Sequence, residues 1–220
     1  MKTLQKFGGF AALYMVVAHL IGMAIFLVVL DYPSITDPAQ KVALLVEMQM
    51  VTFSTNLIMY VFFGIFLIVL SLALYDRLKS GSPAIMQVAT VIGIIWAGSL
   101  IASGMVANAG IAPVVALYAK DPAEAALTWQ GIETVANGLG NANGEILGGL
   151  STLLVSLAAL RVDGLPKGLN ILGLLVGAAG IISLIPGLTG VMVGVFGLSQ
   201  LIWFVWLGIV LLRSNLSRAL

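Results

Sequence analysis

Residues 129–149, WQGIETVANGLGNANGEILGG, carry side chains that lipid does not tolerate within a segment of helical character. Polar side chains recur at every fourth position, at Glu133, Asn137, Asn141 and Glu145. A second row has almost no side chain, at Ala136, Gly140, Gly144 and Gly148. Residues four apart share one face of a helix, so a polar ridge runs beside a bare one. We expect both ridges to face other helices or water, because neither suits hydrocarbon.

The composition around this segment is that of an integral membrane protein surrounded by lipid. Of 220 residues, 60% are hydrophobic and 9% are charged, against about 25% charged in soluble domains. Cysteine is absent, which excludes disulfides, thiolate metal sites and cysteine nucleophiles. A net charge of +1 without a long run of basic residues indicates no nucleic-acid partner.

Apolar stretches long enough to cross a bilayer occur six times. A helical span needs about 20 residues, and the candidates are residues 7–30, 51–75, 84–106, 141–160, 169–185 and 191–212. The first exceeds the length of a signal-peptide core, so we expect it to remain as a span. The expected fold class is all-α, a polytopic bundle of six transmembrane helices in one integral membrane domain over residues 1–220.

Basic residues between these stretches gather on one side of the expected membrane. Eight of the ten belong to that side: Lys2, Lys6, Arg77, Lys79, Arg161, Lys167, Arg213 and Arg218. Lys41 and Lys120 belong to the other side. Because basic loops stay in the cytoplasm, both termini are predicted to be cytoplasmic.

Two longer connections on the outer side carry helix-start signals. Asp37 and Asp121 each supply an N-cap carboxylate, and a proline follows at the first helical position. We expect helices that begin there and continue inward to the ends of the second and fourth stretches, forming a small extracytoplasmic helical cap. The alternative is a short surface helix joined by a kink to each span.

The same two segments form an internal repeat. Asp121 follows Asp37 by 84 positions (121 − 37), and Arg161 follows Arg77 by the same interval (161 − 77). Both copies enter the membrane from one side, so the repeat is parallel. At this offset the bare ridge corresponds to a row that includes Asn56 and Tyr60. We therefore expect small residues to leave room for these two side chains or for a ligand.

Glu145 is a candidate functional carboxylate. It precedes Arg161 by 16 residues (161 − 145), which is roughly 24 Å along a helix that rises about 1.5 Å per residue. At this depth, near the outer boundary of the hydrocarbon core, an ionisable group indicates a gate or a proton-linked site. The alternative is a hydrated helix start in the membrane interface.

His19, the only histidine, and Gln200 fall near the middle of the first and last stretches. Polar groups in lipid need partners, so these two side chains are expected to hydrogen-bond across helices. The pair is a candidate for a substrate contact or a proton step. The alternative is a contact between helices that performs no chemistry. One histidine without cysteine cannot build a tetrahedral zinc site, and no metal or cofactor is predicted.

Four stretches carry a resemblance to known sequences. They are GGFAALYMVVAHLIG at 8–22, VLSLALYDRL at 69–78, LPKGLNILGLLVGAAGIISL at 165–184 and LIWFVWLGIVLLR at 201–213. Together they resemble a bacterial family of six-span integral membrane proteins that carries only a domain-of-unknown-function label. The resemblance implies six spans and a bacterial inner membrane, and it supplies no site residues.

Two function classes remain open, and no catalytic motif is present that would favour an enzyme. The first is a carrier, channel or binding protein for a small molecule, with a polar cavity between the second and fourth spans. Its expected lining is Asn56, Tyr60, Asn137, Asn141 and Glu145, with His19 and Gln200 at the floor. The second is an accessory or assembly subunit. It would pack through its glycine faces against another copy or a larger membrane complex. Glycine is dense in the last three stretches, as at Gly173, Gly177 and Gly180, which indicates close helix packing.

Overall fold

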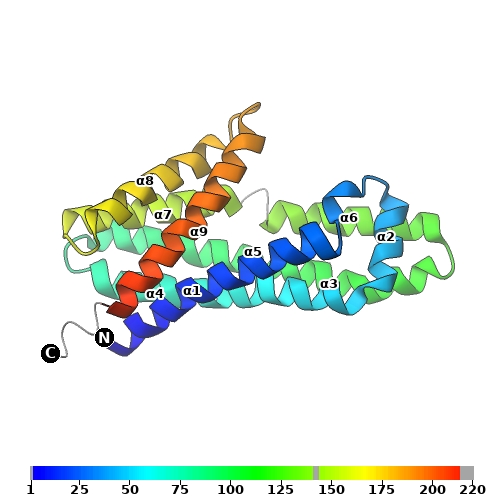
Figure 1. Ribbon diagram of the computed structural model, residues 1–220, viewed down its shortest axis with the longest axis horizontal. Helices are drawn as coiled ribbons and strands as arrows, with labels where there is room; N and C mark the ends of the chain where they lie inside the picture. The colour runs from blue at the N-terminus through cyan, green and yellow to red at the C-terminus, as the bar shows by residue number, and fades with distance from the viewer. Residues whose placement is uncertain (1, 141–143, 214–220) are drawn as a thin grey trace. The chain divides into compact units, whose positions relative to one another are not determined.

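The computed structural model describes residues 2–140 and 144–213, which are helical nearly throughout and contain no strand (Figure 1). The α-helices are α1 (Lys2–Ala24), α2 (Pro38–Glu47), α3 (Gln49–Asn56), α4 (Phe63–Leu78), α5 (Pro83–Tyr118), α6 (Pro122–Gly140), α7 (Gly144–Arg161), α8 (Lys167–Ile182) and α9 (Thr189–Arg213). Two π-helical turns, η1 (Ile25–Val29) and η3 (Leu57–Phe62), and one 3-10 turn, η2 (Tyr32–Ser34), complete the described elements.

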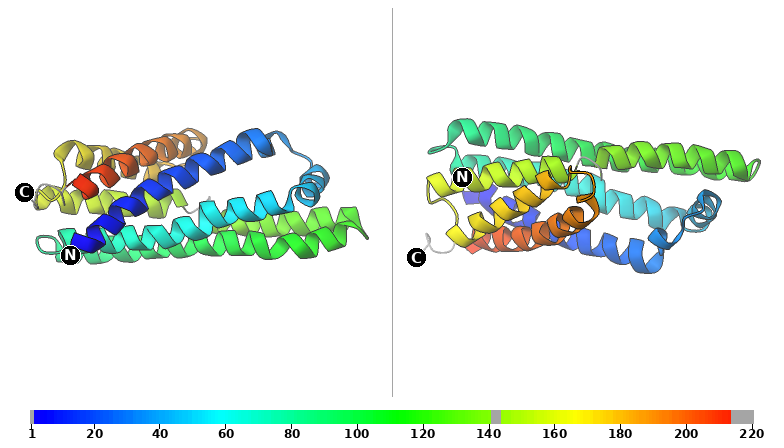
Figure 2. Two further views of the ribbon diagram at one scale, coloured as in Figure 1. Left: turned by 60° about the horizontal axis from the view of Figure 1, so that its bottom comes forward. Right: turned by 90° about the horizontal axis from the view of Figure 1, so that it is seen from above.

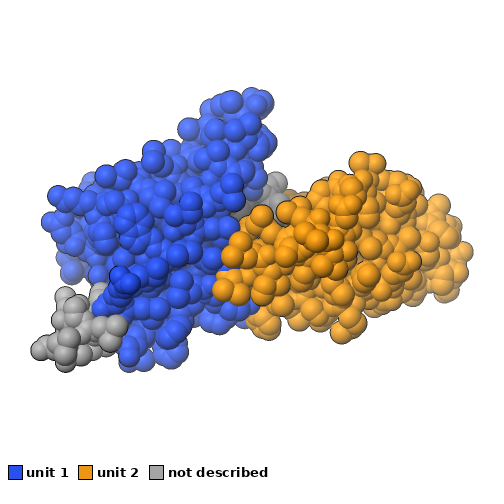
Figure 3. Space-filling model, in the orientation of Figure 1, with its two compact units in different colours: residues 1–16, 64–98, 143–220 blue, residues 17–63, 99–142 orange. Residues whose placement is uncertain are grey.

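The chain divides into two compact units, which Figure 3 colours separately. Unit 1 comprises residues 1–16, 64–98 and 143–220, and unit 2 comprises residues 17–63 and 99–142. Both α1 and α5 contribute residues to each unit. The hydropathy pattern does not predict this division. It locates apolar spans along the sequence, but it does not show which spans pack together.

Five helical stretches are long and apolar enough to cross a membrane. They are Thr3–Val29, Gln49–Leu78, Pro83–Tyr118, Pro122–Arg161 and Thr189–Arg213. Their outer faces expose large apolar side chains such as Phe7, Val28 and Val191, which lipid solvates and water does not. α8 lies at the expected fifth span and has 16 residues, fewer than the about 20 that a span needs. These helices are those of a membrane protein, and the count of six spans stays a prediction.

Both predicted helix starts are confirmed. The Asp37 carboxylate accepts a hydrogen bond from the backbone N–H of Ala39 at 3.1 Å, directly before α2. The Asp121 carboxylate accepts from the N–H groups of Ala123 and Glu124, both at 3.0 Å, directly before α6. Each carboxylate satisfies amides that have no partner inside their own helix.

The helix that starts after Asp37 does not continue inward without a break. α2 ends at Glu47, and Met48 adopts φ −115° and ψ 30° before α3 begins. The alternative of a short helix joined by a kink therefore describes this segment. In the segment that starts after Asp121, α6 ends at Gly140, and residues 141–143, including the predicted site residue Asn141, lie outside the described residues.

α5 extends beyond the third apolar stretch, which the hydropathy pattern placed at residues 84–106. The helix continues to Tyr118 and contains Pro113. A proline removes one helical hydrogen bond, but Ile111 and Val114 on either side of it are buried in the core of unit 2. Burial of these side chains offsets the lost hydrogen bond. Local sequence signals do not report this burial, because it depends on contacts with other helices.

The core of unit 2 forms where α2, the end of α5 and α6 meet. Its buried members are Val42, Leu45, Ile111, Val114, Ala125, Ala126 and Trp129. α2 packs directly against α6, as the views of Figures 1 and 2 show. This core fixes the position of α2, which carries Lys41, against α6.

In unit 1, α8 packs against both α7 and α9 (Figure 1). The α7–α8 contact brings backbone against backbone. A Cβ atom added at Gly177 would lie 2.8 Å from the carbonyl oxygen of Gly149, and one added at Gly149 would lie 3.0 Å from the Cα of Gly180. Glycine at all three positions permits this approach, as the dense glycine in this part of the sequence predicts.

We predict that Gly177→Ala destabilises the protein, because the added methyl group would overlap Leu153 and the Gly149 carbonyl. Overpacking of this kind costs about 1–3 kcal/mol. The thermal unfolding midpoint in detergent, followed by tryptophan fluorescence, is expected to fall. Gly194→Ala on α9 is the matched control, because no side chain and no other helix lies within 4 Å of its Cβ position. Equal midpoints for the two variants would contradict the close α7–α8 contact.

Candidate functional site

Unit 2 contains a cavity of about 410 Å³, which lies within the range of roughly 300–1,000 Å³ found for small-molecule sites. The polar side chains that line it are Tyr32, Lys41, Thr52, Asn56, Tyr60, Ser103, Glu133 and Asn137. The apolar part of the lining is Phe26, Pro33, Ile35, Ala107, Trp129 and Ala136. The lining therefore joins α2, α3, α5 and α6 with the segment that follows α1.

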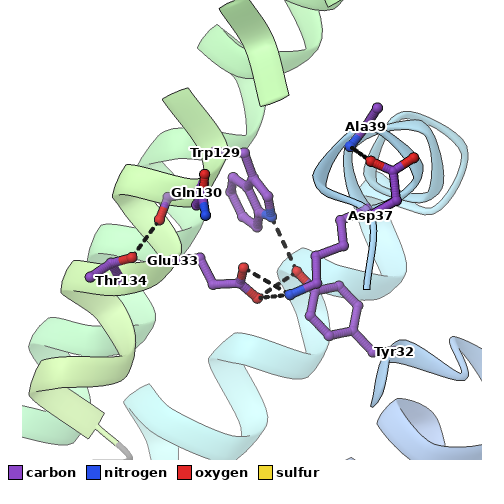
Figure 4. A network of polar contacts seen from close by, with 8 residues as sticks. Tyr32, Asp37, Ala39, Trp129, Gln130, Glu133 and Thr134 are labelled. Carbon is purple, nitrogen blue, oxygen red and sulfur yellow. Dashed lines mark hydrogen bonds and ion pairs between the residues drawn. The ribbon is translucent and has the colours of Figure 1, made fainter. Parts of the chain in front are cut away.

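A network of polar contacts between α6 and two preceding segments forms one wall of the cavity (Figure 4). Lys41 Nζ lies 3.0 Å from Glu133 Oε2 and 3.1 Å from Oε1. The Tyr32 hydroxyl donates to Glu133 Oε1 at 2.8 Å, and Trp129 Nε1 donates to the Tyr32 hydroxyl at 3.1 Å. The carboxylate thus accepts from an ammonium group and a phenol, and both bonds are strengthened by its charge.

The Lys41 ammonium group has an aromatic neighbour as well as a carboxylate. Its Nζ lies 4.8 Å from the centroid of the Tyr32 ring, within the range of about 6 Å for a cation–π contact. The Lys41 and Glu133 side chains keep 22% and 20% of their accessible surface. The pair is therefore shielded from water on most sides but remains reachable.

A constrained turn places Tyr32 at this wall. Asp31 adopts a left-handed conformation with φ 45° and ψ 37°, which costs a residue with a side chain roughly 1–3 kcal/mol. The Ser34 hydroxyl closes the turn as a hydrogen-bond donor. It lies 2.8 Å from the Asp31 carbonyl oxygen and 2.8 Å from the Asp31 carboxylate. Phe26 meets the Tyr32 ring edge to face at 5.9 Å between centroids. These contacts hold the phenol in one orientation.

Amide side chains line the cavity at a second wall. Asn56 is 4% exposed, and its Nδ2 donates to Asn108 Oδ1 at 2.9 Å. Asn108 Nδ2 in turn donates to the carbonyl oxygen of Phe53 at 3.1 Å. This chain of hydrogen bonds joins α3 to α5 and fixes the Asn56 side chain at the cavity surface.

Small residues on two helices make room for Tyr60. A Cβ atom at Gly104 would lie 2.7 Å from the Tyr60 Cβ, and one at Gly140 would lie 3.3 Å from its ring. The Ser103 hydroxyl joins the same two helices by donating to the Ala136 carbonyl oxygen at 2.7 Å. The contact of Gly140 with the Tyr60 ring is the close approach that the row of small residues on this helix predicts.

The structure brings three of the seven predicted site residues to one cavity, namely Asn56, Tyr60 and Asn137. His19 is partly exposed on α1 within unit 2 and is not part of the cavity lining. Asn141 lies outside the described residues. That the three lining residues bind a substrate stays a prediction.

The other two predicted site residues belong to unit 1. Glu145 lies in the first turn of α7 and is partly exposed. Gln200 on α9 is 4% exposed, and its Oε1 accepts a hydrogen bond from Thr152 Oγ1 at 3.0 Å. The partner of Gln200 that the structure shows is thus a hydroxyl on α7, whereas the sequence predicted His19.

Four residues of the cavity wall with the ion pair, here called the charged wall, were not predicted as site residues: Tyr32, Lys41, Trp129 and Glu133. Glu133 belongs to the same polar ridge as Asn137 and precedes it by one helical turn, so its position was a usable signal. Lys41 is one of only two basic residues on the expected outer side. Their pairing joins positions 92 residues apart, which no local pattern reports.

Comparisons with known proteins assign no family to the chain. No protein-family model matches it, and no match is found among curated proteins or solved structures. Within residues 2–140 and 144–213, no group of three or more acidic or histidine side chains could hold a metal ion.

We predict a pH dependence that is specific to Tyr32. Burial is the largest cause that raises the pKa of its hydroxyl above the usual value of 10.0, and the Glu133 carboxylate raises this pKa further, while the Trp129 hydrogen bond opposes both. The folded protein thus keeps a proton that the unfolded chain loses. Stability from this group is fully present below pH 10 and is lost as the pH rises further, by up to about 1.4 kcal/mol per pH unit.

Between about pH 10 and 11.5, the free energy of unfolding should therefore fall more steeply for the native protein than for Tyr32→Phe. Chemical unfolding of both proteins at several pH values measures the two slopes. The variant is expected to start from a lower stability at pH 8, because it loses two hydrogen bonds. Parallel profiles above pH 10 would show that the phenol is not buried as described.

Proposed function

We propose that this protein is an integral membrane carrier, channel or binding protein for a small molecule, and that the cavity of unit 2 is its binding site. The observation that carries the proposal is the Lys41–Glu133 ion pair in the cavity wall. Apolar side chains in place of a shielded ion pair are often neutral or stabilising. A charged pair beside a cavity is therefore better explained by recognition than by stability.

The rest of the lining supports the same proposal. Aromatic rings with a few polar groups that converge on one space are typical of small-molecule sites. Here Phe26, Tyr32 and Trp129 supply the rings, and Asn56 and Asn137 supply amides. A cavity near the second span was also expected from the sequence, and this cavity lies beside α3, at the start of that span, and α6, which precedes the predicted fourth span.

The proposed membrane arrangement has six spans with both termini in the cytoplasm of a bacterial cell. The distribution of basic residues supports it, because Lys41 and Lys120 are the only two outside the predicted cytoplasmic side. In this arrangement the core formed by α2, α5 and α6 lies on the outer side, and the cavity opens toward that side.

The alternative, an accessory subunit that packs through glycine faces, is supported less, because several glycines are already packed within the chain, whereas Gly190, Gly194 and Gly197 on α9 lie in open space. Gly149, Gly177 and Gly180 already meet one another at the α7–α8 crossing inside unit 1. Gly104 and Gly140 are likewise used to accommodate Tyr60 inside unit 2. These glycines are therefore explained by contacts within the chain.

We predict that Ala107→Phe abolishes ligand binding by filling the cavity that Ala107 lines. Native mass spectrometry of the protein, gently extracted from its own membrane, should show a small bound mass that this variant lacks. Ala109→Phe is the matched control on the same helix, because Ala109 is exposed and is not part of the lining. A particle that contains other polypeptides and no small mass would contradict the proposal and favour the accessory subunit.

The membrane arrangement predicts a labelling pattern that the absence of cysteine makes simple to measure. Thr36 and Ser80 are both exposed, and they lie in segments predicted on opposite sides of the membrane. A membrane-impermeant thiol reagent should label Thr36→Cys in intact cells and should label Ser80→Cys only after the cells are permeabilised. The reverse pattern would place the termini outside.

A further inference from the structure

The Lys41 ammonium group occupies a complete cation site made by other residues of unit 2. Glu133 provides the counter-charge at 3.0 Å, and the Tyr32 ring provides an aromatic face at 4.8 Å. The Tyr32 hydroxyl also donates to the same carboxylate, which holds the carboxylate and the ring in a fixed relation. A carboxylate beside an aromatic face is the recognition chemistry for an ammonium group.

We propose that the ligand of this cavity is an amino-acid-like zwitterion. Its ammonium group takes the place of the Lys41 ammonium on Glu133 and Tyr32, and its carboxylate pairs with the displaced Lys41. This inference rests on the proposed function and adds the class of ligand to it.

Charge balance within the cavity favours a zwitterion over a singly charged ligand. Lys41 and Glu133 are the two ionised side chains of the lining, and they neutralise each other. A ligand that is only a cation would pair with Glu133 and leave Lys41 without a partner. A ligand that is only an anion would pair with Lys41 and leave Glu133 uncompensated. An unpaired charge in a shielded site is unfavourable, so among ligands that carry charge a zwitterion is the one that leaves every charge paired.

The geometry allows this exchange without rebuilding the site. The lysine ammonium group is carried on a flexible four-carbon stem, and its side chain is 22% exposed, so the group can move while α2 stays packed. Glu133 and Tyr32 stay in place, because Trp129 binds the Tyr32 hydroxyl and is itself part of the buried core. The site therefore exchanges one ammonium group for another.

The test uses the full-length protein in detergent and the twenty common amino acids as probes, with thermal stabilisation and then calorimetry as readouts. Each amino acid that binds is compared with its methyl ester, which keeps only the positive charge, and with its N-acetyl derivative, which keeps only the negative charge. Both derivatives are expected to bind at least about tenfold more weakly than the parent, because each leaves one charge unpaired. Equal affinity of either derivative, or no binding by any amino acid, would overturn the proposal.

Two variants give a reciprocal change in selectivity that a purely structural role would not produce. Glu133→Gln removes the cation partner and leaves Lys41 free, so the N-acetyl derivative should bind as well as the amino acid. Lys41→Gln leaves Glu133 free, so the methyl ester should bind as well as the amino acid. Lys120→Gln, at an exposed lysine of the same unit, is the matched control and should keep the native preference. An unchanged preference in both cavity variants would overturn the assignment of the two charges.

The outcomes separate this inference from the proposed function. A bound neutral or singly charged molecule that is lost in Ala107→Phe would overturn the zwitterion and leave the binding site intact. Absence of any ligand in both experiments would overturn both proposals.

Discussion

Hydrocarbon offers no hydrogen-bond partners, so a chain that crosses a membrane must satisfy its own amides and carbonyls. The described residues meet this constraint by forming helices nearly throughout, and the interruptions obey it as well. At the break after α2, the Met48 amide still donates to the Leu44 carbonyl oxygen at 2.8 Å. Two buried side chains of unit 2 follow the same rule, since the hydroxyls of Thr55 and Ser103 donate to backbone carbonyls at 2.7 Å. In unit 2, polar groups from several helices meet beside the cavity, where they bind one another.

One residue connects the packing of unit 2 to its chemistry. Trp129 is 5% exposed in the core that joins α2, α5 and α6, and its indole N–H binds the Tyr32 hydroxyl at the cavity wall. The apolar part of the ring stabilises the contact between helices, whereas the polar edge orients the phenol. A tryptophan can serve both purposes, because one edge of its ring carries a hydrogen-bond donor. The position of the charged wall therefore follows from the same burial that fixes α2.

Local signals in the sequence predicted the features that depend on neighbouring residues. Asp37 and Asp121 were identified as helix caps because capping involves atoms within three positions, and the structure confirms both. Asn137 was singled out because helical spacing is visible in a sequence. Contacts at long range were beyond such signals. The pairing of Lys41 with Glu133 depends on how α2 packs against α6, and the continuation of α5 through Pro113 depends on burial of its neighbours. The division into two units is likewise a property of packing.

The neutrality of the Lys41–Glu133 pair has a consequence for energy coupling. A single elementary charge that moves across the whole membrane gains or loses about 2.3 kcal/mol per 100 mV of potential. A pair of opposite charges 3.0 Å apart carries no net charge, so the membrane voltage exerts no net force on it. The zwitterion proposed above is also neutral, so its binding and release would move no net charge, and its occupancy would follow the concentration of the ligand and not the voltage of the cell.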